Sequence, residues 1–490
     1  MATEYKGGRW LAWLASARLF WLLAGLNLLI TLVVAAATFG TISGDHYTYM
    51  GYADGLLQGR YTYWYFLPDY IPDTFRNPGY PLFLLLIRAL GGGDGLARIV
   101  QTLLYLITIG LVVRLAARCE TDSRSWLVRN LFLLLLLPNI QLAYFAALVF
   151  PEMLVAFLVA LYVYVAITWP LSGWKRTVVL ALLAGLIFQT RPVFILFPLG
   201  HLALDFWQNR SMGMFSWLKG IVLLVLFGAT MLPYAFWNYR HHGVFKPTSL
   251  EGGAGVMQLG FWALRMPGYH ETRYWGNTMG DEVVSFAEPA EVPGYIAAFN
   301  AEWDQIDAAT RPLLTARDLR YLPQMRNNDR NMFPTYNSDY TVRREKLLLQ
   351  ATIANIRREP GYYLKTRLYT LVRLWVTGVQ LNAWREAASP LAKIKVIYPA
   401  LASGFTFLLG IICLAWGLFH QRAIQCTRTW WLSLALVVYF GLVHIPFSIQ
   451  ARYTVPVRPW LLLAIAVALG AWLVRRMPLA PAATKPAETR

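Results

Sequence analysis

Long apolar runs constrain the fold of this chain more than any other feature of its sequence. A helix needs about 20 consecutive apolar residues to cross a lipid bilayer, and the chain carries a series of such stretches. They lie near residues 18–40, 96–115, 126–147, 150–170, 176–190, 192–207, 216–237, 396–418, 429–447 and 457–475. Charged residues make up only 14% of the chain, well below the share in soluble proteins. The sequence therefore predicts an all-α polytopic membrane protein with about ten spans.

Basic residues gather beside these runs, and their placement predicts the orientation of the chain. Lys6, Arg9 and Arg18 precede or open the first run, and further arginines and lysines flank the short loops of the same side. The positive-inside rule then places both termini in the cytoplasm. The net charge of +18 follows from this topology and from anionic lipid, so we expect membrane lipids and no nucleic acid as partners. The first run lacks a cleavage site and is predicted to be a retained span.

The spans divide the chain into four predicted parts. Residues 1–237 form a transmembrane module, which includes a first extracytoplasmic loop at 41–95. Residues 238–395 are the only long polar region and are predicted to form a modest extracytoplasmic domain. Residues 396–476 carry the C-terminal spans, and the Pro- and Ala-rich residues 477–490 are predicted to be a disordered cytoplasmic tail.

Two shorter apolar segments are predicted to be helices at the membrane surface. The first is "NPGYPLFLLLIRALGGG" at 77–93, whose apolar part is too short to span comfortably. The second, in the outer domain, repeats apolar residues at helical spacing, with basic residues elsewhere on the helix. Its apolar row is Leu364, Leu368, Leu371, Trp375 and Val379.

Metal and disulfide chemistry leave little trace in the sequence. The cysteines, Cys119, Cys413 and Cys426, all fall on or near the cytoplasmic side, with no disulfide framework or zinc spacing. His241 and His242 are adjacent, which is poor geometry for chelating one ion. A set completed by His270 or Glu271 is conceivable. We therefore expect no certain cofactor, while a divalent metal stays open.

Charged residues recur where predicted spans meet the outer face. Asp45 follows the first span, Glu152 opens the fourth, and Arg191 lies at the turn between the fifth and sixth. Arg240 follows the seventh span and Arg452 precedes the last. Charged groups at membrane depth are costly and mark function by default. Because the topology places these distant residues at one depth, the sequence predicts a site on the outer face.

The residue types suit transfer from a phosphorylated lipid. Arginine binds phosphate through a planar fork of donors and stabilises charge on a leaving phosphate. A carboxylate near an apolar boundary is expected to have a raised pKa, which suits a general base for a hydroxyl. Outside the cytoplasmic membrane there is no pool of nucleotide sugars, so a membrane-anchored donor would account for a membrane-embedded enzyme.

Each candidate also has a structural alternative. Asp45 could cap the helix that follows it, and Glu152 suits the dipole at the start of a helix. Tyr49 and Tyr52 share one face of a helix with Asp45, where they could stack a sugar ring or form an interfacial aromatic belt. Arg191 could be a snorkelling interface residue. Asp205 is expected to be solvated near a cytoplasmic helix end.

Six segments together resemble a known family. They are "GDHYTYMGYADGLLQG", "FRNPGYPLFLLLI", "LVFPEMLVAFLVAL", "IFQTRPVFILFP", "WNYRHHGVF" with the following "GGAGVMQLG", and "ARYTVPVRPWLLL". In their order and topology they resemble the polytopic GT-C-fold glycosyltransferases that use polyprenyl-phosphate sugars, especially the protein O-mannosyltransferase and lipid A aminoarabinose transferase group. The resemblance covers nearly the whole chain.

The resemblance implies a GT-C-like helix bundle and an inverting transfer to an acceptor hydroxyl, which we expect at the exterior face of the cytoplasmic membrane. Asp45 would be the general base and Glu152 the second acidic residue. The residues expected to bind donor or substrate are His46, Tyr49, Tyr52, Arg60, Arg76, Arg191, Arg240, Arg452 and Tyr453. His46 stands beside a single Asp where many relatives carry two acidic residues, which puts a metal-bridged mechanism in doubt. The acceptor stays open as a glycan, a lipid or a protein.

Two other functions remain as alternatives. A transporter or flippase for lipid-linked glycans would suit the many spans, but the inverted repeats typical of transporters are not visible in the sequence. An O-antigen ligase or polymerase would share the lipid-linked donor and transfer an oligosaccharide instead of a single sugar.

Overall fold

The computed structural model describes most of the chain as helices joined by short connections. The described residues are 6–42, 44–119, 126–171, 173–208, 214–266, 286–325, 334–379, 381–424 and 426–476. Within these residues the structure contains no β-strand. The predicted all-α architecture is confirmed. The predicted tail at 477–490, together with His270 and Glu271, lies outside the described residues.

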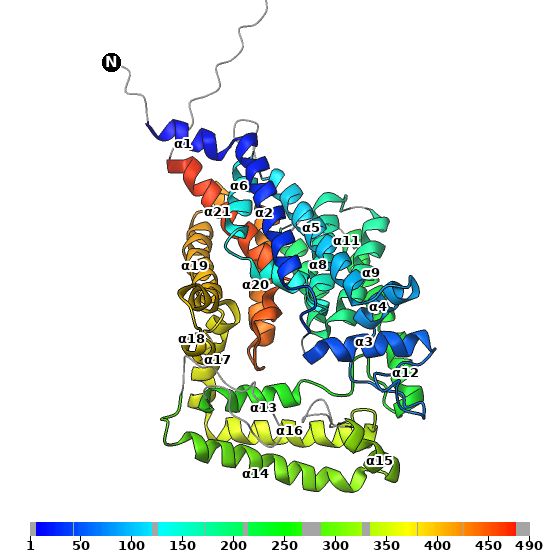
Figure 1. The fold of residues 1–490 in the computed structure, drawn as a ribbon. Helices are drawn as coiled ribbons and strands as arrows, with labels where there is room; N and C mark the ends of the chain where they lie inside the picture. Colours follow the sequence, from blue (N-terminus) through cyan, green and yellow to red (C-terminus); the bar gives the residue numbers. More distant parts are fainter. Residues whose placement is uncertain are drawn as a thin grey trace, which may run out of the picture.

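The helices follow one another from the N-terminus in the order shown in Figure 1. The first twelve are α1 (Lys6–Leu14), α2 (Ala17–Ala37), α3 (Gly44–Leu57), α4 (Gly79–Ala89), α5 (Asp94–Ala117), α6 (Leu127–Leu136), α7 (Gln141–Ala146), α8 (Pro151–Thr168), α9 (Trp174–Thr190), α10 (Phe197–Gln208), α11 (Met214–Ala229) and α12 (Leu232–His242). The others are α13 (Ala254–Trp262), α14 (Val292–Thr310), α15 (Ala316–Met325), α16 (Ser338–Arg358), α17 (Pro360–Trp375), α18 (Leu381–Glu386), α19 (Pro390–Phe419), α20 (Thr427–His444) and α21 (Arg458–Arg476). Short 3-10 turns include η2 (Pro192–Phe194) and η6 (Ala451–Thr454).

Six helical segments in the described part of the chain are long and apolar enough to cross a membrane. They are Ala17–Ala37, Asp94–Ala117, Pro151–Thr168, Trp217–His242, Pro390–Phe419 and Arg458–Arg476. The other predicted spans coincide with shorter or less apolar helices. The run at 126–147 was expected to be one span, but it forms α6 and α7, because Pro138 between them cannot continue a helix. The run at 192–207 likewise opens with η2 before α10 begins.

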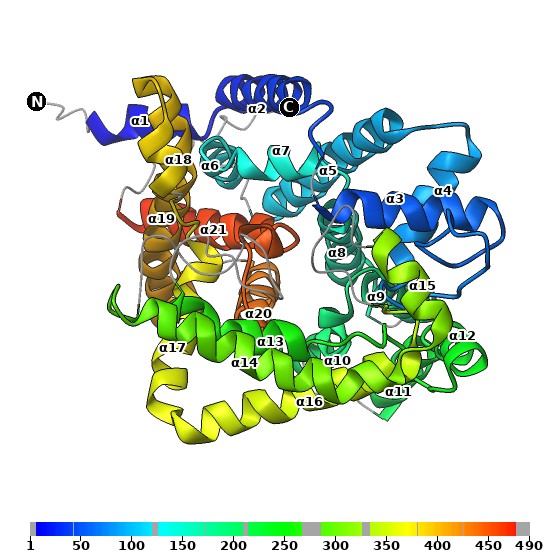
Figure 2. The ribbon, with the colours of Figure 1, turned by 60° about the horizontal axis from the view of Figure 1, so that its bottom comes forward.

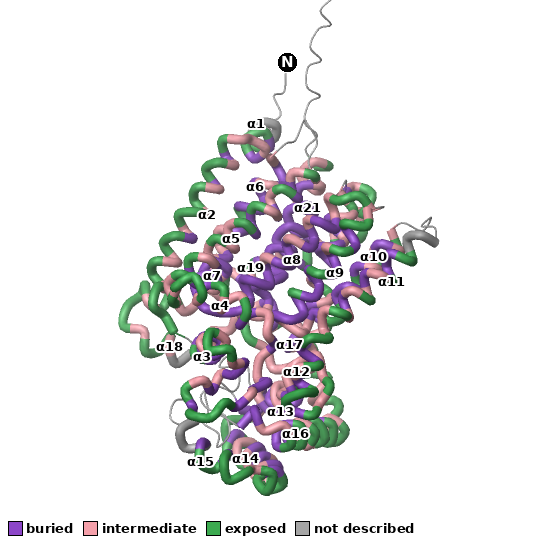
Figure 3. The backbone as a smooth tube through the Cα atoms, turned by 90° about the vertical axis from the view of Figure 1, so that its right-hand side faces the viewer, coloured by how far each residue is buried: buried purple, intermediate pink, exposed green. Residues whose placement is uncertain are grey.

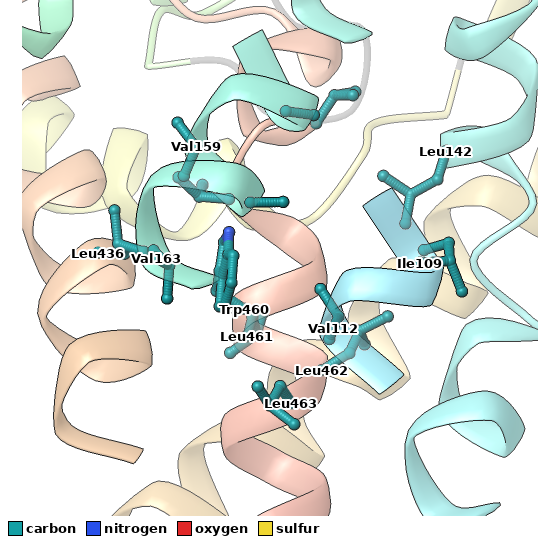
Figure 4. Close-up of a cluster of buried hydrophobic side chains, with 14 of the residues drawn as sticks. Ile109, Val112, Leu142, Val159, Val163, Leu436, Trp460, Leu461, Leu462 and Leu463 are labelled. Carbon is teal, nitrogen blue, oxygen red and sulfur yellow. The ribbon is translucent and has the colours of Figure 1, made fainter. Parts of the chain in front are cut away.

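The helix α21 forms the centre of the bundle. Most of its residues from Arg458 to Ala468 are buried, as expected for a helix that is apolar on all sides. Figure 4 shows Trp460, Leu461, Leu462 and Leu463 among side chains of α5, α8 and α20. By contrast α2 presents large apolar side chains outward along its length, which Figure 3 shows as an exposed edge of the bundle. Such an exposed apolar surface suits contact with lipid.

The polar segment 238–395 provides a separate helical layer. Figures 1 and 2 show α13, α14 and α16 running side by side across one end of the bundle. Their own apolar core contains Trp262, Phe299, Trp303 and Leu348. We call this arrangement the outer layer. The first loop, with α3 and α4, lies at the same end of the molecule in Figure 1.

Several contacts link the first loop to the segment 238–395, among them two side-chain hydrogen bonds to aspartates of the loop. The hydroxyl of Tyr321 donates to Asp69 at 2.7 Å, and the hydroxyl of Thr335 donates to Asp73 at 2.9 Å. Asp73 is fully buried and also accepts a hydrogen bond of 2.6 Å from Tyr52. Because these bonds join residues far apart in the sequence, they hold the first loop and the outer layer together.

The predicted amphipathic helix is α17, and its polarity is reversed relative to a soluble helix. Leu364 and Leu368 are exposed, whereas Thr366, Arg367 and Thr370 are buried. The apolar row therefore points away from the protein, which suits contact with lipid. Leu371 is half-buried, and Trp375 is buried at the end of the helix.

Two further expectations, for the cysteines and for Asp205, are wrong. Cys119 and Cys426 form a disulfide that links the end of α5 to the start of α20, although sequence spacing indicated no bridge. These residues are 307 positions apart, so only the tertiary fold brings them together.

Asp205 was expected to be solvated, but it is buried. Its carboxylate pairs with Arg176 at 3.2 Å, Arg428 at 2.9 Å and His201 at 3.3 Å. A carboxylate on α10 can be buried there because cationic groups on α9 and α20 compensate its charge. We call these four residues the Asp205 cluster.

Candidate active site

A cavity of about 1680 Å³ lies between the helix bundle and the outer layer. One wall comes from α3, the start of α8, η2, the end of α20 and η6. The other comes from residues 248–256, α14 and α16. A cavity of this size and position can hold a large substrate between a membrane-embedded wall and a polar one.

Two carboxylates enter the cavity from the first turns of helices. Asp45 is the second residue of α3, and Glu152 follows Pro151 at the start of α8. Both positions suit an acidic side chain, because the N-terminal end of a helix carries a partial positive charge. The side chain of Glu152 is 1% exposed, while that of Asp45 is 26% exposed.

Three arginines meet these carboxylates. Arg76 Nη2 donates to Asp45 Oδ1 at 2.8 Å, and Arg452 Nη2 lies 2.6 Å from Asp45 Oδ2. Arg191 Nη2 pairs with Glu152 Oε1, and Arg452 Nε approaches the same oxygen at 3.6 Å. We call these five residues the charge cluster. The guanidiniums outnumber the carboxylates, so the cluster has one positive charge in excess.

Local sequence explains how the arginines reach the cluster. Arg191 ends α9 in an extended conformation, which the following Pro192 favours. Arg452 lies in η6, just before the buried helix α21. Arg76 lies at a bend in the connection that leads to α4, so none of the three arginines lies inside an α-helix.

The pKa of Asp45 differs from the sequence-based expectation. Burial alone would raise the pKa of this carboxyl, but the charges of Arg76 and Arg452 outweigh burial and hold it below its usual value. The expected raised pKa is therefore wrong for this state of the site. Asp45 is held in its charged form by two arginines that come from distant parts of the chain.

Glu152 keeps one oxygen without a partner. Its Oε1 faces Arg191 and Arg452, but Oε2 has no hydrogen-bond partner among the described residues although it is buried. A buried polar atom of this kind is costly unless something binds it. A substrate hydroxyl would satisfy this oxygen.

Aromatic rings support the arginines. Arg76 lies over the rings of Tyr49, at 5.1 Å, and Phe75, at 4.1 Å. Arg452 lies over Phe150 at 4.5 Å, and Tyr453 lies within 6.0 Å of both Arg191 and Arg452. Such cation–π contacts hold a guanidinium in one orientation, and the guanidinium loses little of its hydration by making them. Tyr49 therefore supports a charged side chain and does not line the cavity itself, whereas Tyr453 does.

Other predicted residues lie at different places. His46 lines the cavity and is 2.6 Å from Asp94, but it does not join the charge cluster. Tyr52 is buried, does not line the cavity and donates a hydrogen bond to Asp73. Arg60 lies 5.9 Å from the ring of Tyr70 and does not line the cavity. Arg240 is exposed on α12 and does not line it either.

The cavity contains two further groups of charges that sequence reasoning missed. At one end Arg88 pairs with Asp54 at 2.9 Å and approaches Asp94 at 3.8 Å. On the outer-layer wall Arg344 pairs with Glu251 at 2.7 Å. Glu345, on the same wall, accepts hydrogen bonds from the backbone N–H groups at the start of α13. Apart from Asp94, which opens α5, these residues do not lie at the end of a long apolar run, which was the signal used to find candidates.

His444, at the end of α20, is another cavity residue that was missed. Its Nδ1 lies 2.8 Å from the carbonyl oxygen of Phe440, a geometry in which Nδ1 carries the proton. Nε2 is then a hydrogen-bond acceptor in the wall of the cavity. Its position at the outer end of a predicted span would have flagged it, had histidine been included with the charged residues.

No metal site is evident in the described part of the chain. It contains no group of three or more His, Cys, Asp or Glu side chains placed to hold an ion. His241 and His242 are neighbours on α12 and lie outside the cavity lining.

Comparisons with known proteins give one structural likeness. No family model matches the sequence, and no curated protein matches it. Among solved structures, the chain is similar to ArnT from Cupriavidus metallidurans bound to undecaprenyl phosphate. The two share 15% identity over 91% of this chain and 77% of that one, with a TM-score of 0.34. At this identity and TM-score the likeness identifies no reaction, substrate or partner for this chain.

Proposed function

We propose that the protein is a membrane glycosyltransferase that moves a sugar from a polyprenyl-phosphate donor to an acceptor hydroxyl. The observation that carries this proposal is the charge cluster, in which three arginines and two carboxylates meet in one cavity at the end of an apolar bundle. A cluster with excess positive charge at that place suits an anionic group attached to a lipid.

The donor would bind with its phosphate on the charge cluster. Arg76, Arg191 and Arg452 supply guanidinium forks that match phosphate oxygens, and aromatic rings hold Arg76 and Arg452 in place. Phe440, Val443 and Phe447 give the same cavity an apolar side next to the bundle. That side suits the isoprenoid chain of the donor, because contact between apolar surfaces removes both from water.

The transfer would invert the anomeric carbon. The acceptor hydroxyl gives its proton to Asp45 and its oxygen bonds to the anomeric carbon, while the bond from that carbon to the phosphate oxygen breaks. The electrons of the broken bond stay on the phosphate, where the arginines stabilise the charge. Glu152 Oε2 would hold a sugar or acceptor hydroxyl and so orient the reacting groups.

We place this reaction at the exterior face of the cytoplasmic membrane, with the protein as a multi-pass component. The basic residues at the opposite ends of the helices support this orientation, since Arg176 opens α9 and Arg428 opens α20, while Arg191 and His444 stand at or just past their far ends. The outer layer then covers the cavity from outside, where a glycan, lipid or protein acceptor would enter.

The experiment feeds the purified chain in lipid nanodiscs a panel of undecaprenyl-phosphate and diphosphate sugars and follows release of the lipid phosphate. We expect Asp45→Asn to reduce turnover by about 100-fold or more, as for loss of a general base. Arg191→Ala should raise the KM for the donor much more than the KM for the acceptor, because it removes a phosphate contact. Asp307→Asn, which changes an outer-layer carboxylate outside the cavity lining, is the matched control.

Three results would count against the proposal. Full turnover by a folded Asp45→Asn variant would remove Asp45 as the base. Equal effects of Arg191→Ala on both substrates would indicate a structural role for that arginine. Passage of a lipid-linked sugar across the bilayer of vesicles that contain the protein, without its consumption, would support a transporter instead.

A further inference from the structure

In the structure, both oxygens of Asp45 are engaged by arginines. Oδ1 accepts a hydrogen bond of 2.8 Å from Arg76, and Oδ2 lies 2.6 Å from Arg452. A general base must present an oxygen to the proton that it takes, and short charge-assisted bonds to two guanidiniums oppose this. The observed arrangement is therefore a resting one, and something must loosen these bonds before Asp45 can act.

The partners of Asp45 are also the groups that face the cavity. Arg76 and Arg452 both line it, and a guanidinium fork accepts a phosphate in the same geometry as a carboxylate. The Nε of Arg76 is buried and has no hydrogen-bond partner among the described residues, so its N–H group is available to a ligand. The excess of one positive charge in the cluster matches the single charge of a phosphodiester.

We propose that the donor phosphate and the Asp45 carboxylate compete for Arg76 and Arg452, so that donor binding displaces Asp45 and makes it available as the base. This inference rests on the proposed function and adds an order of events to it. The base is released only when the donor occupies the cavity. An acceptor that arrives first meets a carboxylate that is still paired.

Competition also accounts for product release. After transfer, the acceptor proton is on Asp45 and the polyprenyl phosphate carries the electrons of the broken bond. A phosphate monoester bears close to two negative charges and would bind the arginines tightly. When Asp45 passes its proton to water, the carboxylate regains its charge and competes again for Arg76 and Arg452. The same contact that restrains the base at rest thus helps the product to leave.

The test measures equilibrium binding of undecaprenyl phosphate to the full chain in nanodiscs. Asp45→Asn and Asp45→Ser remove the competing charge, and each should bind the lipid phosphate about tenfold more tightly than the wild type, as for loss of one charge-assisted competitor. The matched control is Asp54→Asn, which removes the same charge from the same cavity at a carboxylate held by Arg88. Its affinity for the lipid should stay at the wild-type value. Two Asp45 variants are used so that the test still gives a result if one of them does not fold.

The outcomes separate this inference from the function on which it rests. Wild-type or weaker affinity in both Asp45 variants would overturn the competition while leaving lipid-phosphate binding intact. Equal tightening in Asp45→Asn and Asp54→Asn would show an effect of net charge alone and would also overturn it. Absence of lipid-phosphate binding to the wild type and to both Asp45 variants would overturn the proposed function itself.

Discussion

At the scale of single residues, Asp73 is fully buried and the pKa of its carboxyl is raised. Burial raises its pKa from the usual 3.8 to about 6, although hydrogen bonds from Tyr52 and Thr335 and from the Thr74 backbone favour the charged form. The charge of Glu251 raises the pKa further. Since the folded state binds this proton more tightly than the unfolded state, the contribution of Asp73 to stability is full below pH 4 and is lost as the pH rises through 6.

We therefore predict that the link between the first loop and the outer layer is weaker at pH 7.5 than at pH 4.5. The effect on the free energy of unfolding should be on the order of 2 kcal/mol, from the size of the shift. Thermal unfolding of the wild type and of Asp73→Asn at both pH values measures it. The Asn variant should lose this part of the pH dependence. An identical dependence in both proteins would show that Asp73 does not titrate in this range.

His444 gives a second prediction at this scale. If its Nε2 accepts a hydroxyl of a bound sugar, His444→Phe should raise the KM of that substrate by about 2- to 10-fold, as for one lost hydrogen bond. His444→Gln keeps an acceptor and should recover part of the loss. Steady-state kinetics with each substrate varied in turn locates the effect. A loss of kcat alone, with unchanged KM, would contradict a role in binding.

The sequence could identify candidate residues but not their electrostatic state. Asp45, Glu152, Arg191 and Arg452 were proposed because topology places the ends of distant spans at one depth, and the structure brings them within contact. The direction of the Asp45 pKa shift was wrong, because it depends on which arginines reach the carboxylate. Arg240 has the same position at a helix end, yet it is exposed, since spacing along the chain does not state which way an arginine points.

At the scale of elements, the packing of α4 against the end of α9 sets the distance between two arginines. Gly79 opens α4 three residues after Arg76, and a Cβ added there would lie 2.6 Å from the backbone of Gln189 and Thr190. These residues immediately precede Arg191. Any side chain at Gly79 must therefore push the segment that carries Arg76 away from the segment that carries Arg191.

We predict that Gly79→Ala loses turnover and about 1–3 kcal/mol of stability, as is typical of overpacking. The control is Gly110→Ala on α5, where an added Cβ would meet nothing within 4 Å. Donor turnover and thermal unfolding of both variants measure the effect. If Gly79→Ala matched the control in both measurements, the spacing of α4 and α9 would not matter for the site.

Helices could be predicted from the sequence where an apolar run is long enough by itself to determine a membrane span. The predicted spans at 96–115 and 457–475 correspond closely to α5 and α21, because an apolar run of that length has few other ways to satisfy its backbone. The run at 126–147 was mistaken for one span. Its mean hydropathy is barely changed by Pro138, but the helix backbone cannot continue through this proline. The spacing in 364–375 predicted α17, although Val379 lies beyond its end.

At the scale of the whole molecule, the Asp205 cluster ties the two halves of the bundle together. Asp205 lies on α10 and Arg176 on α9, whereas Arg428 opens α20 in the second half of the chain. Arg176 and Arg428 stand at the opposite helix ends from Arg191 and His444. The cluster therefore anchors the bundle at the end far from the cavity, near the Cys119–Cys426 bridge.

Removal of Asp205 should destabilise the whole chain without touching the cavity. Asp205→Ala leaves the buried guanidinium of Arg176 without its carboxylate, and we expect a loss of about 3–5 kcal/mol, as when one partner of a buried pair is deleted. Thermal unfolding in detergent measures the loss. The donor KM of the protein that remains folded should be unchanged. A raised donor KM at normal stability would contradict a purely structural role.

At the scale of the cavity, only one of its two walls could be predicted from the sequence. Its membrane-side wall could be placed from topology, because span ends share a depth. The outer-layer wall could not, since the positions of Glu251, Arg344 and Glu345 depend on how α13 and α16 pack together. Buried partners such as Asp73 and Thr335 were equally beyond reach, as each becomes close to the other only after folding.

The position of Arg452 has a consequence for how the protein is made. Asp45 leaves the ribosome early in synthesis, while Arg452 leaves it only after most of the helices have been made. Until then one oxygen of Asp45 lacks the guanidinium that neutralises it, and the cavity has no final wall. If the proposed function holds, a half-made chain would lack one of the three arginines proposed to bind the donor phosphate, and it would bind a lipid phosphate more weakly than the finished protein.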